Sequence, residues 1–311
     1  MSEHRGLQRV AVHSIDHFAL NVPSLSEAER FFSAFGLDVA RVEEALDIRA
    51  GDGHRWARIL PSDGKSLAYL SFNCFEGDLP KIRRQLMAAG ATVKPNSLEA
   101  TSETGSIWFN DPDGNLIQVR VGPKTTPHEK TSLVHTEVAS DSRGSCMRSE
   151  LGKVRPRRMS HVLLFTPDTL RAVDFYEHGL GLRLSDRSAD IIAFTHAPHG
   201  SDHHLLAFVK STAKGWHHVA WDVASIDEVG TGATQMAAAG YREGWGTGRH
   251  VLGSNYFHYV RDPWGSFSEY SADMDFVSAG TQWPAGDFLP EDSLYQWGPD
   301  VPDYFIRNTE T

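Results

Sequence analysis

The sequence has very few cysteines. Its 311 residues include two, Cys74 and Cys146, and neither belongs to a C-x-x-C motif. Two cysteines cannot provide the disulfide framework of a secreted scaffold, and they suit a reducing compartment. Residues 1–16 also lack the apolar segment of a secretory signal. We therefore expect a cytoplasmic protein.

Positive charge and long apolar runs are scarce as well. The formal net charge is −10, with 30 Lys and Arg against 40 Asp and Glu. This balance gives no electrostatic footprint for nucleic acid. No apolar run approaches the ~20 residues that cross a bilayer. We expect neither nucleic acid nor a membrane as a partner, and the length suggests about two domains.

Histidine is the residue type in unusual supply. The chain has 16, and some stand in adjacent pairs at 203–204 and 217–218. Clustered imidazoles favour a metal site, although a single histidine in an apolar strand more often belongs to the core. The metal hypothesis therefore depends on where the histidines stand relative to carboxylates.

Two halves of the chain repeat one pattern of elements. Periodicity, caps and turns in the first half predict strands and helices at 14–22, 23–35, 56–60, 67–73, 79–89, 106–110 and 116–121. In the second half, 159–165 matches the first strand and 168–178 matches the first helix. The polar stretch between the halves has no sustained period and is predicted to be a linker. A repeat of this length indicates a duplicated domain rather than a solenoid, whose periods are roughly 20–50 residues.

The last predicted hairpin carries a carboxylate among aromatic residues. An aromatic strand at 256–260 leads through the turn 262–265 to a strand that contains Glu269. Because side chains alternate along a strand, Phe267, Glu269 and Ser271 share one face. A lone glutamate is more often a surface residue, but a carboxylate on an inner face must be paired.

The two copies differ where a metal could bind. The second half has His161 in its first strand and Glu269 in its last, where the first half has His17 and Gln118. An amide is a poorer metal ligand than a carboxylate, so we expect the site in the second half only. Two imidazoles and one carboxylate form a facial triad that suits Fe(II).

The second imidazole would come from the pair His217–His218. Strand alternation predicts that one of the two faces the site, and the pattern does not choose between them. His204, His250 and Tyr259 accompany the triad in the same half. Each has an ordinary interpretation as a core or solvated residue. Their joint occurrence beside the carboxylate favours a functional site.

Three motifs give the chain a family resemblance: SHVLLF with His161, HHVAW with His218, and DPWGSFSEY with Glu269. From about residue 14 to 272 it resembles a type I extradiol ring-cleaving dioxygenase of the vicinal oxygen chelate superfamily. The resemblance implies that His161, His218 and Glu269 are the metal ligands. It takes His218, the later histidine of its pair, as the second ligand.

Two more motifs match residues of that family around the substrate. In SDHHLLAF the family's acid–base histidine falls on His204, with His203 as a weaker candidate. Residues 248–265 match the pattern GRHxxxxNxFxYxxDPxG. The resemblance implies that His204, His250 and Tyr259 are catalytic, and that His250, Asn255 and Tyr259 bind substrate.

The resemblance also implies the fold. It is α+β, with two tandem domains, each a pair of βαβββ modules that form a curved, barrel-like mixed sheet around a central funnel. The expected boundaries are 1–122 for a non-catalytic domain with a degenerate metal site, 123–158 for the linker, 159–272 for the catalytic domain and 273–311 for a tail.

The implied activity is extradiol (meta) cleavage of a catechol-type ring by O₂, which gives a hydroxymuconic semialdehyde-type product in aromatic degradation. Fe(II) is the expected cofactor, Mn(II) could replace it, and a homo-oligomer is expected. Gly253 and Leu163 depart from two substrate-defining positions of the family, so the identity of the ring substituents stays open.

The alternative functions are a hydroquinone or trihydroxybenzene ring-cleaver and a non-catalytic aromatic-binding protein. A glyoxalase-type isomerase would need a second carboxylate ligand, which Gln118 and Leu163 do not supply.

Overall fold

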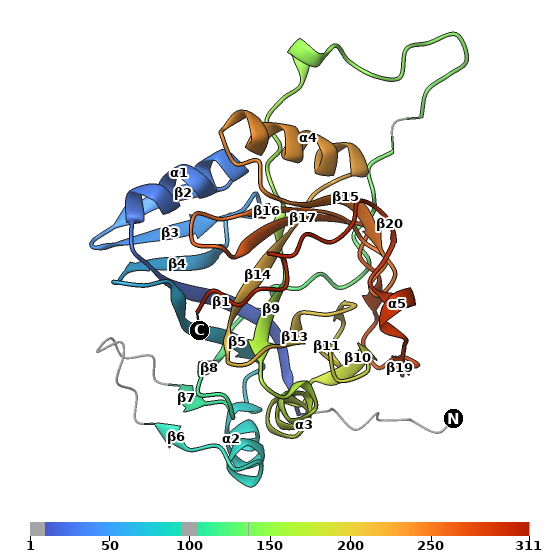
Figure 1. Cartoon of the computed structure of the whole chain (residues 1–311). Coiled ribbons are helices and arrows are strands. Elements are labelled where there is room, and N and C mark those ends of the chain that lie inside the picture. The colour runs from blue at the N-terminus through green and yellow to red at the C-terminus, as the bar shows by residue number, and fades with distance from the viewer. Residues whose placement is uncertain (1–9, 95–104, 136, 311) are drawn as a thin grey trace.

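The computed structural model describes residues 10–94, 105–135 and 137–310. Figure 1 shows two curved sheets whose helices lie on their outer sides. The sequence predicts no secretory signal in residues 1–16, and the first nine of these lie outside the described residues. No helix in the described part of the chain is long and apolar enough to cross a membrane.

The first half forms an eight-stranded sheet with the order β2-β3-β4-β1-β5-β8-β7-β6. Its elements are β1 (Val12–Val22), α1 (Leu25–Phe35), β2 (Asp38–Val42), β3 (Ala45–Arg49), β4 (Arg55–Pro61), β5 (Ser66–Cys74), α2 (Leu79–Ala88), β6 (Val93–Lys94), β7 (Ser106–Asn110) and β8 (Leu116–Val121).

The second half forms a ten-stranded sheet with the order β19-β10-β11-β13-β9-β14-β17-β16-β15-β20, beside a small sheet of β12 and β18. Its elements are β9 (Arg158–Thr166), α3 (Thr169–Leu180), β10 (Arg183–Ser188), β11 (Ile192–His196), β12 (Ser201–Asp202), β13 (Leu206–Lys210), β14 (Gly215–Asp222), α4 (Ile226–Ala238), β15 (Gly244–His250), β16 (Tyr256–Arg261), β17 (Phe267–Ala272), β18 (Phe276–Val277), β19 (Gly286–Asp287), α5 (Pro290–Ser293) and β20 (Tyr295–Trp297).

Each large sheet is built from two modules that meet at a central antiparallel pair. In the first sheet β1 pairs with β5, and each of them also pairs in parallel with the last strand of its own module, β4 or β8. In the second sheet β9 and β14 form the same pair, with β13 and β17 as the parallel partners. The predicted α+β fold of paired βαβββ modules is confirmed.

The first helix of each half begins and ends as its sequence predicts. The Ser24 side chain accepts a hydrogen bond from the Glu27 N–H at the start of α1, and Gly36 ends the helix with φ +98°. Asp168 and Gly181 do the same for α3. A short polar side chain pairs an otherwise unsatisfied N–H, and glycine adopts the left-handed conformation without steric cost.

The two halves pack through their helices and through residues at the strand ends. Helix α1 contacts α4, and α2 contacts α3. The rings of Phe35 and Tyr270 stack with centroids 3.8 Å apart, and the Tyr270 hydroxyl donates to the Phe35 carbonyl at 2.8 Å. The buried Lys65 Nζ lies 2.6 Å from Glu310 Oε1 and donates to the Trp216 carbonyl. The first half therefore supports the strand of the second half that carries His217 and His218.

The segment between the sheets and the C-terminal segment both lie against the body of the molecule. Thr125 bonds to Ser14 and Ile15 of β1, and the Pro156 carbonyl accepts from Gly51 N–H. Residues 137–150 form an exposed loop that projects beyond α4 in Figure 1. Beyond residue 272, β19 and β20 add an edge strand to each side of the second sheet. These strands are too short to produce a readable period in the sequence.

Replacing Phe35 with alanine should destabilise the whole chain. The ring is fully buried and stacks across the two halves, so its loss should lower the free energy of unfolding by about 3–5 kcal/mol. Urea unfolding followed by tryptophan fluorescence measures this change. The control Met87→Ala removes a side chain that is 60% exposed and should change stability by less than about 0.5 kcal/mol. Equal effects of the two variants would contradict the packing role of Phe35.

Candidate metal centre and active site

The candidate metal ligands stand on three neighbouring strands at the middle of the second sheet. Ala220 of β14 pairs with His161 of β9 on one side and with Glu269 of β17 on the other. Residues that pair directly share a face of the sheet, and so do residues two apart on one strand. His218, two residues before Ala220, therefore joins His161 and Glu269 on the same face.

The ligand atoms converge. The two Nε2 atoms of His161 and His218 are 3.2 Å apart, and Glu269 Oε2 lies 3.4 Å from the first and 3.5 Å from the second. All three residues are buried. Three donor atoms that share one ion at about 2.1 Å lie about 3.0–3.4 Å from one another. The spacing therefore fits a single divalent cation.

Glu269 supplies a second argument for a cation. Its side chain is fully buried, and Oε2 has no hydrogen-bond partner among the described residues. Oε1 accepts from the Asn255 amide at 2.9 Å. An unpaired buried carboxylate oxygen is costly, and a cation at this position removes the cost. The residues present therefore fit the metal that the donor set implies.

A β-bulge explains why both histidines of the pair 217–218 line the cavity. The pairing of β14 with β9 shifts between Trp216 and His218, so His217 is the extra residue. A bulge interrupts the alternation of side chains. Of the two, His218 belongs to the group that could hold a metal and His217 does not, which agrees with the expectation that one of them faces the site. The bulge brings His217 to the cavity wall beside it.

His217 also determines which nitrogen of His218 is free. Its Nε2 donates to the Phe305 carbonyl at 2.9 Å, and its Nδ1 lies 2.7 Å from His218 Nδ1. Burial lowers the pKa of His217 to about 3, so the ring is neutral and its Nδ1 accepts. The shared hydrogen then belongs to His218 Nδ1, which leaves His218 Nε2 with a lone pair for a metal.

His204 lies beside the first ligand. Its ring centroid is 4.1 Å from that of His161 and 4.7 Å from that of Phe194. Burial, followed by charge on the neighbouring histidines, places the pKa of His204 well below its usual value. The sequence-predicted acid–base residue is therefore next to the candidate ligands and neutral.

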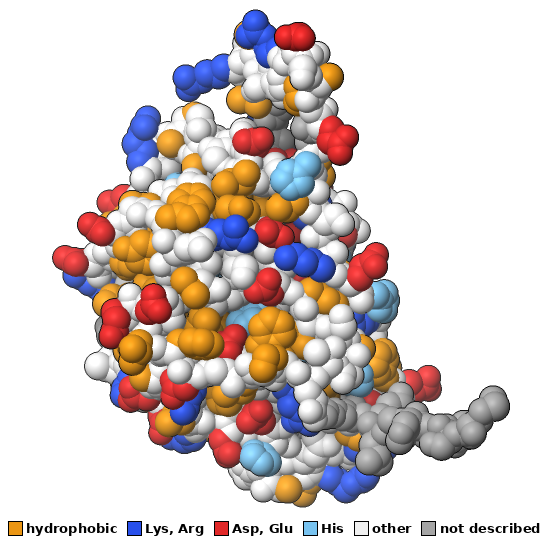
Figure 2. All heavy atoms as spheres, turned by 90° about the vertical axis from the view of Figure 1, so that its right-hand side faces the viewer, with side chains coloured by type: hydrophobic (Ala, Val, Ile, Leu, Met, Phe, Trp, Pro, Cys, Tyr) orange, Lys and Arg blue, Asp and Glu red, His pale blue; other side chains and the backbone are white. Residues whose placement is uncertain are grey.

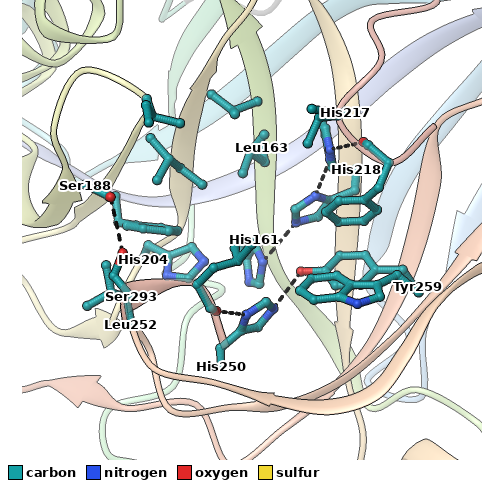
Figure 3. Close-up of a pocket in the computed structure, with 18 of the residues that line it drawn as sticks. His161, Leu163, Ser188, His204, His217, His218, His250, Leu252, Tyr259 and Ser293 are labelled. Carbon is teal, nitrogen blue, oxygen red and sulfur yellow. Dashed lines mark hydrogen bonds between the residues drawn. The ribbon is translucent and has the colours of Figure 1, made fainter. Parts of the chain in front are cut away.

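His250 and Tyr259 form a hydrogen-bonded pair at the other side of the cavity. His250 Nε2 lies 2.9 Å from the Tyr259 hydroxyl, and His250 Nδ1 donates to the Leu294 carbonyl at 2.7 Å. Burial lowers the pKa of His250. Burial and the nearby Glu269 raise the pKa of Tyr259 well above its usual value, so Tyr259 keeps its proton. Figure 3 shows the pair across the cavity from His204.

Asn255 lines the same cavity, but its amide group is largely engaged elsewhere. The amide nitrogen donates to Glu269 Oε1 and to Ser271 Oγ at 3.0 Å. Its Oδ1 is buried without a hydrogen-bond partner among the described residues. The contacts of Asn255 thus orient a candidate metal ligand. The substrate contact that the sequence predicts for it stays a prediction.

The cavity has a volume of about 160 Å³ and mainly apolar walls. The histidines and Tyr259 form its polar end, and Leu163, Ile191, Ile192, Phe194, Val209 and Leu252 line the rest of it. The C-terminal segment closes it with Pro290, Ser293, Leu294, Phe305 and Ile306. Sequence reasoning did not place any residue of this segment at the site, because none of them belongs to a periodic element or a recognisable motif.

The corresponding positions of the first half bond to one another. Ser71 of β5 pairs with His17 and Gln118, as Ala220 does with His161 and Glu269. Tyr69 therefore stands where His218 stands, and its hydroxyl is 3.0 Å from His17 Nε2. Gln118 accepts from Ser71 at 2.8 Å, and His17 Nδ1 lies 2.6 Å from the Asp16 carboxylate. A phenol and an amide thus replace two of the three candidate ligands.

Comparison with known proteins identifies the superfamily of the chain. Residues 14–119 and 158–270 match the Glyoxalase/Bleomycin resistance protein/Dioxygenase superfamily. The chain is 63% identical to Metapyrocatechase 2 of Cupriavidus necator over 302 residues, which cover 97% of this chain and 94% of that protein.

Two solved structures share the fold. The Mn(II)-bound glyoxalase from Novosphingobium aromaticivorans has a TM-score of 0.76 at 24% identity, over 96% of this chain and 99% of that one. An extradiol ring-cleaving dioxygenase from B. fuscum has a TM-score of 0.75 at 19% identity, over 96% and 83%. The chain belongs to the glyoxalase/bleomycin resistance protein/dioxygenase superfamily, and within it to the extradiol dioxygenases of the vicinal oxygen chelate fold.

Proposed function

We propose that the protein is an extradiol dioxygenase that opens a catechol-type ring by meta cleavage, with both atoms of O₂ entering a hydroxymuconic semialdehyde-type product. The observation that carries this proposal is the convergence of His161 Nε2, His218 Nε2 and Glu269 Oε2 at the polar end of an apolar cavity. The 63% identity to Metapyrocatechase 2 supports it.

The three convergent atoms would hold Fe(II), with Mn(II) as a substitute that the same donors accept. Bound iron would bring the catechol oxygens and O₂ together and pass electron density from the ring to oxygen. Asn255 keeps Glu269 oriented through its amide hydrogen bond. His217 keeps the His218 ring in the tautomer that offers Nε2.

The other polar side chains handle protons. A catechol must lose a hydroxyl proton when it binds, and the neutral His204 ring beside His161 would take it and return it to oxygen later. Tyr259 keeps its proton and donates it to His250 Nε2. The remaining lone pairs of the Tyr259 hydroxyl would accept a hydrogen bond from a substrate hydroxyl at the side of the cavity opposite His204.

The cavity walls indicate the ring substituents. Among the described residues that line it there is no Lys, Arg, Asp or Glu. A carboxylate on the ring would lose its hydration without gaining a partner, which is costly. We propose that the substrates are catechols with hydrogen or small apolar substituents.

Three alternatives make different use of the same scaffold. Hydroquinones and trihydroxybenzenes stay candidate substrates and belong in the assay panel. A binding protein would suit the apolar cavity but would have no use for His204, His250 and Tyr259 around an intact triad. In the described part of the chain, the group that could hold a metal contains one carboxylate, which disfavours an isomerase that needs two.

The homo-oligomer and the cytoplasmic location stay predictions.

Glu269→Gln should abolish both metal binding and turnover. The variant replaces the charged ligand with an amide, as in the first half of the chain, so bound iron and O₂ uptake should fall at least about 100-fold. Metal analysis of protein reconstituted anaerobically with Fe(II), followed by O₂ uptake with catechol, measures both. Glu243→Gln, at a carboxylate that is 65% exposed, is the matched control. A Glu269→Gln variant with full iron and full activity would exclude this ligand set.

His204→Phe should separate an enzyme from a binding protein. The phenyl ring is flat and aromatic like imidazole but cannot move a proton, so O₂ uptake should fall by about 10²–10⁴ while iron content and catechol affinity stay near wild type. His178→Phe, at a histidine that is 68% exposed, is the control. Unchanged turnover would remove His204 from the chemistry. A wild-type protein that binds catechol but consumes no O₂ would favour the binding protein.

The charge of the ring substituent should decide selectivity. We expect kcat/KM for 4-methylcatechol to exceed that for 3,4-dihydroxybenzoate by roughly 100-fold or more, because no Lys or Arg side chain among the described lining residues can pair with the carboxylate. Ile306→Arg places a cation at the cavity mouth, where Ile306 is 66% exposed, and should narrow the ratio. Equal kcat/KM values for both substrates in the wild type would contradict the proposal that the cavity selects uncharged ring substituents.

A further inference from the structure

Two pairs of adjacent histidines contribute to the cavity wall, one with both members and one with His204 only, and each pair is joined through its Nδ1 atoms. The distance is 2.7 Å for His217 and His218, and 3.1 Å for His203 and His204. One hydrogen lies between two such nitrogens, so the first histidine of each pair decides whether the second one donates or accepts. For His217 the deciding partner is a backbone carbonyl. For His203 it is a carboxylate.

That carboxylate is Asp186 on β10. Its Oδ2 accepts from His203 Nε2 at 2.8 Å and from Trp283 Nε1 at 3.3 Å, and its Oδ1 accepts from the Gly286 N–H at 2.8 Å. Asp186 and His203 are both buried. The N–H groups of Trp283 and Gly286 donate to its two oxygens, and a carboxylate can only accept, so the hydrogen between Asp186 and His203 belongs to His203 Nε2.

The backbone of His203 is held on both sides, which fixes the direction of its ring. Its N–H donates to the Asp275 carbonyl at 2.6 Å, and its carbonyl accepts from the Ser185 hydroxyl. Phe194 and Trp283 contact the ring. The ring therefore presents Nε2 to Asp186 and Nδ1 to His204.

We propose that Asp186 and His203 are positioning residues that hold His204 in its Nδ1–H tautomer. A His203 ring with its one hydrogen on Nε2 offers a lone pair at Nδ1, so the shared hydrogen belongs to His204 Nδ1. His204 Nε2 is then a hydrogen-bond acceptor on the ring that lines the cavity.

The tautomer matters for the proposed function, on which this role rests. When a catechol O–H bond breaks, its proton must form a new bond to a nitrogen that carries no hydrogen. The Nδ1–H tautomer of His204 provides that nitrogen at Nε2. The opposite tautomer would present an N–H to the substrate and could not take the proton.

The test is the ring tautomer of His204 in metal-free, full-length protein labelled with ¹⁵N-histidine. The ring nitrogen shifts distinguish the two tautomers, and the His204 signals are those lost in His204→Phe. We expect a hydrogen on Nδ1 in the wild type. In Asp186→Asn the Gly286 N–H keeps the amide oxygen, the NH₂ group faces His203, and the hydrogens of both rings should shift to give Nε2–H at His204.

Kinetics of the iron-loaded protein add a second readout. Asp186→Asn and His203→Phe should each lower kcat roughly 10–100-fold with little change in KM, because they alter the tautomer and not the cavity wall. If Asp186 acts through His203, the double variant should be no slower than His203→Phe alone. Asp190→Asn, an exposed aspartate near the same strand, should change neither tautomer nor kcat.

The outcomes separate the two proposals. An Nε2–H tautomer in the wild type, or an Asp186→Asn protein with wild-type tautomer and kcat, overturns the positioning role. If Asp186→Asn does not fold, as thermal unfolding would show, His203→Phe decides by the same two readouts. A wild-type protein with the expected tautomer that cleaves no ring in the panel refutes the proposed function, while the effect of Asp186 and His203 on the His204 tautomer stands.

Discussion

The register of three central strands is the constraint on which the candidate site depends. Ala220 holds His161 and Glu269 in one row, and His218 stands two residues away on the same face. A shift of one residue in either pairing would turn a ligand to the opposite face. The surrounding core, including the stacked Phe35 and Tyr270, fixes this register. The convergence of the three candidate ligands is therefore a consequence of sheet pairing.

The first half shows that the same register can exist without the same chemistry. Ser71 takes the place of Ala220, and Tyr69 and Gln118 occupy two of the ligand positions. These side chains satisfy one another with hydrogen bonds, whereas Glu269 Oε2 in the second half has no partner among the described residues. The first half still contributes to the site, because Lys65 supports the strand that carries His218.

The polar end of the cavity depends on acceptors that lie outside the predicted catalytic domain or far from the motifs. The carbonyls of Leu294 and Phe305 fix the tautomers of His250 and His217. Asp186 stands in the same relation to His203. In each case a hydrogen-bond acceptor decides which nitrogen of the imidazole carries the hydrogen and which one accepts from the neighbouring side chain.

The sequence by itself determined the elements, the duplication and the residues of the candidate site. Capped helices, the turn at 262–265 and the spaced motifs around His161, His218 and Glu269 are local patterns, which a chain records in order. Only the tertiary structure decided that a bulge turns both His217 and His218 to the cavity, that Tyr69 fills the vacant ligand position of the first half, and that the C-terminal segment closes the cavity. Those features arise from contacts between distant residues, and such contacts leave no period or spacing in the sequence.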